Sequence, residues 1–224
     1  MKFKWLNRLS PGRLLVLGFL SLILVGTVLL LLPISANPGV TIGPVDALFT
    51  STSAVCITGL IAIDTSDHFS VFGRTVVALL MQAGGLGITT MGVMFIWLTG
   101  KPIALRERVL VREALNLGSL SGIVRLIRSI LVLTLTFELV GMVLSLLVFM
   151  QDFPFLKALG ISAFHSIAAF NNAGFDILGG YQNLIPYQSN VLLNLTTCGL
   201  IIFGGIGFYV IREIWEKRSF KKLS

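Results

Sequence analysis

Residues 52–60, T-S-A-V-C-I-T-G-L, decide the fold, because they place polar, glycine-containing chain inside a very apolar sequence. The stretch holds three hydroxyls, one thiol and one glycine. The segment before it, 43–55, has the pattern of a helix start, with Pro44 near the first helical position and Asp46 in the first turn. A helix of about a dozen residues is about 18 Å long, roughly half a membrane. The sequence therefore predicts a short helix followed by irregular chain.

The composition is that of a membrane protein. Of the 224 residues, 55% are hydrophobic and 12% are charged, which is too little charge for the surface of a soluble domain. A helix of about 20 apolar residues crosses the hydrocarbon core. Four runs reach this length and are predicted to span the membrane: 14–32, 75–98, 129–150 and 190–211. The first run exceeds the roughly 7 to 15 residues of a signal-peptide core, so we expect it to be a span.

The basic residues indicate how these spans are oriented. Of the 17 lysines and arginines, 15 lie before the first span, between the second and third, or after the fourth. Loops rich in lysine and arginine stay on the cytoplasmic side. We therefore expect a multi-pass protein of the plasma membrane, the inner membrane in bacteria, with both termini in the cytoplasm. The net charge of +7 is then explained by the cytoplasmic placement of the basic residues, and we expect no nucleic-acid partner.

A second outer segment has the same plan as the first. Residues 153–170 predict a helix, and N-N-A-G-F follows at 171–175. Irregular backbone is stable at membrane depth only where protein buries it or where it lines a watery cavity. Each segment is therefore either a loop that enters the membrane and returns, or an amphipathic helix that lies on the outer surface.

An internal repeat favours the first of these interpretations. A shift of 115 residues aligns the pattern F-x-S-x-x-A-x-x-x-x-G with itself, so that Gly59 falls on Gly174. A shift of 120 lays G-G-L-G at 84–87 over G-G-I-G at 204–207. Repeats of this kind identify the architecture of a chain. We predict an all-α membrane protein made of two parallel span–pore loop–span repeats, as in potassium channels.

The predicted organisation has three parts. The first repeat occupies 1–100, a basic amphipathic cytoplasmic linker occupies 101–128, and the second repeat with a basic tail occupies 129–224. Parallel repeats bring both loops to one side of the membrane. The C-terminal ends of the short helices carry partial negative charge, which favours a cation. Backbone carbonyls can replace the water shell of a potassium ion, and a glycine at positive φ allows them to turn inward.

At these residues the sequence resembles the Trk/Ktr/HKT superfamily of potassium transporters, and within it the membrane subunit of bacterial Ktr systems. T-S-A-V-C-I-T-G-L is similar to the first selectivity filter of that family, and F-H-S-I-A-A-F-N-N-A-G-F-D at 164–176 to the second. Q-A-G-G-L-G-I-T-T-M-G at 82–92 resembles the helix after the first filter. The resemblance covers essentially the whole chain.

The resemblance implies potassium uptake through a carbonyl-lined filter. A membrane-embedded enzyme would need a convergent polar set at membrane depth, and the sequence offers only Glu138 and scattered asparagines there, so we expect no enzymatic activity. Gly59 and Gly174 are the filter glycines, with potassium held at Thr58, Gly59, Ala173 and Gly174. The ion pathway comprises eight residues: Cys56, Ile57, Thr58, Gly59, Asn171, Asn172, Ala173 and Gly174. In the plant members a serine at the first filter glycine accompanies sodium transport, so Gly59 implies a preference for potassium.

The resemblance also implies cofactors and partners. Potassium is the transported ion and sodium an activating ion, with no covalent cofactor. The partners are the lipid bilayer, a second copy of the full subunit in a homodimer, and a cytosolic nucleotide-binding regulatory ring.

The chain departs from this family in one respect, since family members carry four span–loop–span units and this sequence carries two. Two loops cannot surround an ion, so either the missing two repeats belong to a longer protein or a second copy of the chain supplies them. The ending R-E-I-W-E-K-R-S-F-K-K-L-S resembles a linker between spans, so we expect the N-terminal half of a longer transporter. The alternative is a natural half-length chain that serves as a non-conducting assembly or regulatory subunit.

Other polar residues have two interpretations each. Glu138, in the middle of a span, is either a pathway carboxylate or a hydrogen-bonded packing residue, and we expect the second. Asp64, Asp67 and Asp176 follow the two glycines and either attract cations or are ordinary loop charges. Asn171 and Asn172 either bind ions or brace the filter, and we expect at least one to brace it.

Overall fold

The computed structural model describes residues 11–87, 90–91, 105–114, 123–207 and 210. The described residues form helices and no β-strand, apart from one isolated bridge between Ala36 and Phe69. The predicted all-α class is therefore confirmed.

Two helices are long and apolar enough to cross a membrane by length and composition. They are α1, Pro11–Leu30, and α7, Ile123–Phe149. α4, Val71–Gly85, and α9, Val191–Ile206, are shorter apolar helices as described. The predicted spans over 75–98 and 190–211 continue beyond α4 and α9 into residues that lie mostly outside the described part. α7 begins six residues before the predicted boundary at 129, because Ile123–Arg128 continue the helix.

Two shorter helices lie between these longer ones. They are α2, Pro44–Cys56, and α8, Phe155–Phe170, and both predicted short helices, 43–55 and 153–170, are confirmed to within two residues. α2 begins at a proline, and its first turn contains Asp46, as the sequence predicted. α8 packs against both α7 and α9, so it is not a helix lying alone on a surface.

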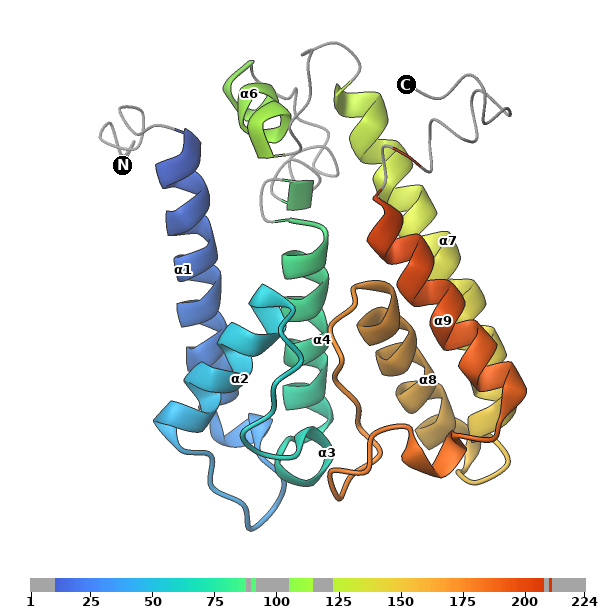
Figure 1. Ribbon diagram of the computed structural model, residues 1–224. Coiled ribbons are helices and arrows are strands. Elements are labelled where there is room, and N and C mark those ends of the chain that lie inside the picture. Colours follow the sequence, from blue (N-terminus) through green and yellow to red (C-terminus); the bar gives the residue numbers. More distant parts are fainter. Residues whose placement is uncertain (1–10, 88–89, 92–104, 115–122, 208–209, 211–224) are drawn as a thin grey trace, which may run out of the picture.

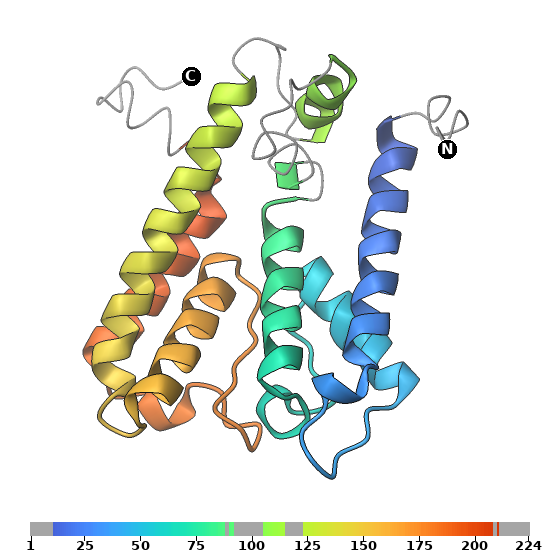
Figure 2. The ribbon, with the colours of Figure 1, turned by 180° about the vertical axis from the view of Figure 1, so that it is seen from behind.

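The helices form two groups of three that lie side by side (Figures 1 and 2). α1, α2 and α4 make the first group, and α7, α8 and α9 the second. α4 contacts α8 and so joins the groups. The helix α6, Leu105–Ala114, contacts α1 and α7 at one end of the molecule. The short elements η2, Pro33–Ser35, α3, Thr65–His68, and η3, Ile185–Tyr187, lie at the other end (Figure 1).

The core runs through both groups and includes four large side chains that are almost fully buried: Leu30, Phe69, Met81 and Phe149. Many apolar side chains on the outer faces of the long helices are instead exposed. Leu139 of α7 is 56% exposed and Leu195 of α9 is 68% exposed. Exposed apolar surface of this extent is typical of a protein that contacts lipid or further protein.

The two short helices are tied to their long neighbours by the same hydrogen bond. In α2, Ser51 Oγ donates to the carbonyl of Ile23 at 2.8 Å. In α8, Ser166 Oγ donates to the carbonyl of Glu138 at 2.7 Å. Both pairs are related by the shift of 115 residues that the sequence pattern shows.

The ends of the short helices contact glycines of α4 and α9. An added Cβ at Gly84 would collide with the carbonyl oxygen of Val55, and one at Gly204 with that of Phe170. Val55 and Phe170 differ by 115, and the two glycines by 120. The G-G-L-G and G-G-I-G stretches therefore serve close helix approach, which small residues permit.

This close approach can be tested with two alanine substitutions in the same helix. Gly204→Ala introduces a methyl group against backbone, and we expect it to lower the free energy of unfolding by about 1–3 kcal/mol, as overpacking does. Gly199→Ala is the matched control, because a Cβ there meets nothing within 4 Å. It should be neutral, or stabilising by up to about 1 kcal/mol through helix propensity. Thermal unfolding in detergent compares the two, and equal midpoints would contradict the proposed contact.

Candidate functional site

The chain leaves both short helices in the same way. Ile57, directly after α2, has φ 56°, and Asn172, its counterpart at the shift of 115, has φ 58°. Two residues later, Gly59 has φ 72° and Gly174 has φ 71°. We call residues 56–60 the first loop segment and residues 171–175 the second loop segment. Their backbones therefore follow matching paths, in which glycine is needed at the last left-handed position.

Matching backbone hydrogen bonds stabilise these turns. The amide of Thr58 donates to the carbonyl of Ser53 at 3.0 Å, and the amide of Ala173 donates to that of Ala168 at 2.8 Å. Bonds of this kind return to the carbonyls that a helix end leaves without helical partners. Each loop segment is thus a continuation of its helix end.

The two loop segments lie against each other at their glycines. A Cβ on Gly59 would be 2.8 Å from the carbonyl oxygen of Ala173 and 3.5 Å from the Cα of Gly174. A Cβ on Gly174 would in turn be 3.4 Å from the Cα of Gly59. Residues 115 positions apart in the sequence are therefore in van der Waals contact, and a side chain at Gly59 would occupy the space of the second segment.

The eight residues predicted for the site all lie in these two segments, but their burial differs. In the first segment Ile57 and Gly59 are half-buried. In the second, Asn171 and Ala173 are buried. The other four are exposed: Cys56, Thr58, Asn172 and Gly174. Cys56 is also the last residue of α2 and not part of the irregular chain as the sequence indicated.

The carboxylates of α3 have a role that the sequence analysis did not identify. Asp64 is only 3% exposed, and its Oδ1 accepts hydrogen bonds from the amides of Ser66 and Asp67, so it caps the helix. Its Oδ2 accepts from the amide of Tyr181 at 2.7 Å. Asp67 Oδ2 accepts from the amide of Gly180 at 3.0 Å. The last two hydrogen bonds join the chain that follows the first loop segment to the chain that follows the second. We call this pair of hydrogen bonds the outer clamp.

The outer clamp excludes one of the two interpretations of Asp64 and Asp67 given above, that of ordinary loop charges, and leaves the attraction of cations as a prediction. Neither carboxylate is an ordinary loop charge, because each binds backbone across the two halves. The order D-T-S-D is typical of a helix cap and could have indicated the role of Asp64. The partner, a turn at 179–183 with several left-handed residues, has no comparable sequence pattern.

Asp176 lies just beyond the second loop segment, near the outer clamp. Its Oδ1 accepts a hydrogen bond from the amide of Leu178 at 2.9 Å. Partial burial raises the pKa of this carboxyl, and the charges of Asp64 and Asp67 raise it further. The charges of Asp64 and Asp67 are therefore close enough to affect Asp176.

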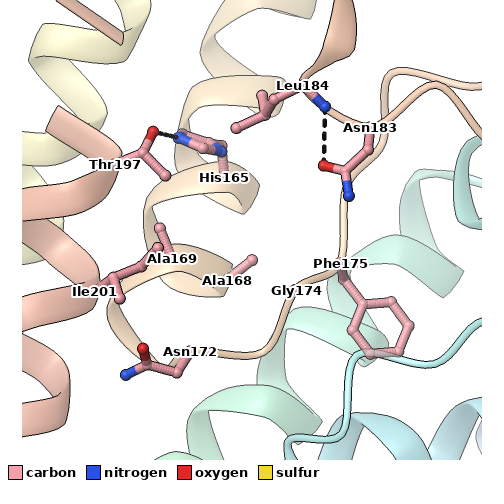
Figure 3. Close-up of a pocket in the computed structure, with 10 residues that line it drawn as sticks. All are labelled: His165, Ala168, Ala169, Asn172, Gly174, Phe175, Asn183, Leu184, Thr197 and Ile201. Carbon is pink, nitrogen blue, oxygen red and sulfur yellow. Dashed lines mark hydrogen bonds between the residues drawn. The ribbon is translucent and has the colours of Figure 1, made fainter. Parts of the chain in front are cut away.

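A cavity of about 220 Å³ lies behind the second loop segment (Figure 3). Asn172 and Gly174 line it on the segment side, and Thr197 and Ile201 of α9 line it on the other. His165 of α8 is buried and is hydrogen-bonded through Nε2 to Thr197 Oγ1 at 3.0 Å. His165 therefore lies on the side of α8 that packs against α9.

Comparison with known proteins gives a consistent result. The profile of the TrkH family, described as cation transport protein, matches residues 14–224. The Ktr system potassium uptake protein B of Bacillus subtilis is 39% identical over 221 residues, which are 99% of this chain and 48% of that protein. The potassium/sodium uptake protein NtpJ of Enterococcus hirae is 39% identical over 224 residues, 100% of this chain and 49% of that protein. The chain spans about half the length of the curated relatives it matches.

Hydrogen exchange tests whether the outer clamp protects the amides of Gly180 and Tyr181. Asp67→Ala removes one acceptor, so we expect the amide of Gly180 to exchange about tenfold faster, the factor for one lost charge-assisted hydrogen bond. Asp64→Ala should have a larger effect, because it releases the amide of Tyr181 and also uncaps α3. Mass spectrometry of peptides covering 176–190 measures both. Unchanged exchange in these peptides would show that the clamp does not form in solution.

Proposed function

The chain belongs to the TrkH family of cation transport proteins, and on this premise we propose that it forms part of a potassium uptake pathway across the plasma membrane. The named relatives are potassium or potassium/sodium uptake proteins. In this proposal the two loop segments are selectivity-filter segments, and the chain acts as a transporter and not as an enzyme.

The observation that carries the proposal is the contact between the two glycines. Gly59 and Gly174 share one backbone conformation and lie side by side, which supports a common axis for the two loop segments. Four carbonyls near this contact, those of Thr58, Gly59, Ala173 and Gly174, would form coordinating layers for a dehydrated potassium ion. The C-terminal ends of α2 and α8 lead into the segments, so that their partial negative charge favours a cation there.

The proposal includes a topology and an organisation. Each group of three helices would be one span–pore loop–span repeat, so that 1–100 and 129–224 are parallel repeats and 101–128 is a cytoplasmic linker. The basic residues before α1, around α6 and after α9 would lie in the cytoplasm, and the outer clamp outside the cell. Sodium would act as an activating ion, and the proposed partners remain a second full subunit and a nucleotide-binding regulatory ring.

Two loop segments provide only part of a coordination shell. Because the relatives are about twice as long, we propose that this chain corresponds to the N-terminal half of a Ktr-type transporter. Two further repeats, from a longer protein or from a second copy of the chain, would complete the filter.

The filter assignment is tested by Gly59→Ser in the protein expressed with its whole coding sequence. The new side chain would meet the carbonyl of Ala173 and would disfavour φ 72°. We expect the preference for potassium over sodium to fall about tenfold or more, equivalent to about 1.4 kcal/mol. Uptake of both ions into cells that lack other potassium transporters measures it.

The control for this experiment is Gly39→Ser. Gly39 also has positive φ, at 81°, but a Cβ there meets nothing within 4 Å. Backbone strain alone should therefore leave the ion preference unchanged. Normal expression of Gly59→Ser with unaltered preference would favour the non-conducting assembly subunit instead.

A pH dependence follows from Asp176. Since its pKa is raised, the carboxyl becomes neutral at a higher pH than an ordinary aspartate as the outer solution is acidified. The negative charge that attracts cations is then lost, so we expect uptake to fall on acidification, by about two- to fivefold for one nearby charge. Asp176→Asn should flatten this decline, whereas Asp46→Asn, in the first turn of α2, should not. Initial uptake rates between pH 4.5 and 7.5 measure it, and identical profiles for wild type and Asp176→Asn would contradict the assignment.

A further inference from the structure

The two loop segments are braced by different chemistry. In the first, Ser53 Oγ donates to the carbonyl of Leu60 at 2.6 Å and accepts from Thr58 Oγ1 at 2.8 Å. The counterparts of Ser53 and Thr58 in the second repeat are Ala168 and Ala173, which have no hydroxyl. The second segment therefore lacks this hydroxyl brace.

Asn171 supplies a different brace from a buried position, being only 8% exposed. Its Nδ2 lies 2.9 Å from Gln82 Oε1 of α4, 2.9 Å from the carbonyl of Ile167, and 3.5 Å from Glu138 Oε1 of α7. An added Cβ at Gly85 would collide with the Asn171 amide, so glycine leaves the space that the amide occupies. The amide thus lies between α4 of the first group and α7 and α8 of the second.

Glu138 and Gln82 complete the set. Glu138 is 8% exposed, and its carboxyl has Asn171 and Gln82 as side-chain hydrogen-bond neighbours. The counterparts of Asn171 and Glu138 in the first repeat are Cys56 and Ile23, which cannot form such a set. This arrangement therefore exists at one of the two segments and joins residues 89 positions apart.

We propose that Glu138 and Gln82 are positioning residues that set ion preference by fixing the second loop segment through Asn171; this inference rests on the proposed function. Asn171 begins the segment, three residues before Gly174. When its amide is held from α4 and from α7, the direction of the carbonyls that follow is fixed against the first segment. A fully bonded buried network is rigid, whereas a partly bonded one leaves its members free to rearrange. Loss of the brace should therefore lower the preference for potassium over sodium while transport itself continues.

The test compares substitutions that keep or remove the hydrogen-bonding atoms, in the protein expressed with its whole coding sequence. Glu138→Gln retains an acceptor at Oε1, so the potassium preference should stay within about threefold of wild type. Glu138→Leu and Gln82→Leu each remove an acceptor, and each should lower the preference about tenfold, the factor for one buried hydrogen bond. Leu139→Ala, on the exposed side of α7, is the control and should change nothing.

Exchanging the amide of Asn171 with the carboxyl of Glu138 separates the effect of this contact from a general loss of folding. Asn171→Asp would place a second carboxyl beside Glu138, and we expect it to lower the preference about tenfold or more. The double substitution Asn171→Asp with Glu138→Gln restores one carboxyl and one amide in exchanged positions. Because an aspartate at this position cannot donate to Gln82 Oε1 or to the carbonyl of Ile167, we expect partial recovery, to a preference about threefold above that of Asn171→Asp alone, which a merely structural defect at either position would not give.

The outcomes separate the inference from the function on which it depends. Uptake ratios of the two ions in cells, with the amount of folded protein measured by size-exclusion chromatography, give the comparison. If wild type transports potassium but Glu138→Leu and Gln82→Leu keep its preference, or the exchange gives no recovery, the inference is overturned and the proposed function stands. Should Glu138→Leu fail to fold, Gln82→Leu and the exchanged pair still decide. A wild type that transports no cation would overturn both.

Discussion

The end of a helix inside a membrane protein leaves backbone carbonyls without helical partners, and the rest of this structure is arranged around two such ends. After α2 and α8 the chain uses the same two features, a left-handed residue, Ile57 or Asn172, and an amide of the next residue that returns to a carbonyl of the last helical turns. The carbonyls of Val55 and Phe170 near these ends face glycines of α4 and α9. Neither end is therefore a free loop, since each is enclosed by its own neighbouring helices.

Because of this enclosure, helix packing determines where the loop segments lie. Gly26 of α1 and Gly141 of α7 each face a serine of the short helix and a leucine of the following long helix. Larger residues at these glycines would push the short helix away and carry its loop segment with it. The contact between Gly59 and Gly174 thus depends on side-chain volumes one or two turns distant. The outer clamp adds a second constraint, since it ties together the chain that leaves each segment.

The sequence predicted the features that depend on local pattern and internal repetition. The short helices, the glycines at positive φ and the equivalence of the two halves all follow from the residue types and the shift of 115. Contacts that occur once were not predictable in this way. The hydrogen bond from Asn171 to Gln82 joins residues from different halves, and the outer clamp joins a helix cap to backbone amides. Backbone donors have no residue signature, and a unique contact has no second copy to indicate it.

The two loop segments have similar backbones but are held by different hydrogen bonds. A hydroxyl brace, as at Ser53, acts within one segment and its own helix. The amide brace at Asn171 acts between helices of both halves. A displacement of one half of the described chain relative to the other would therefore change the hydrogen bonds of the second brace and leave those of the first unchanged. Thr58, Asn172 and Gly174 are exposed in the loop segments, and the proposal requires further segments to complete the coordination shell.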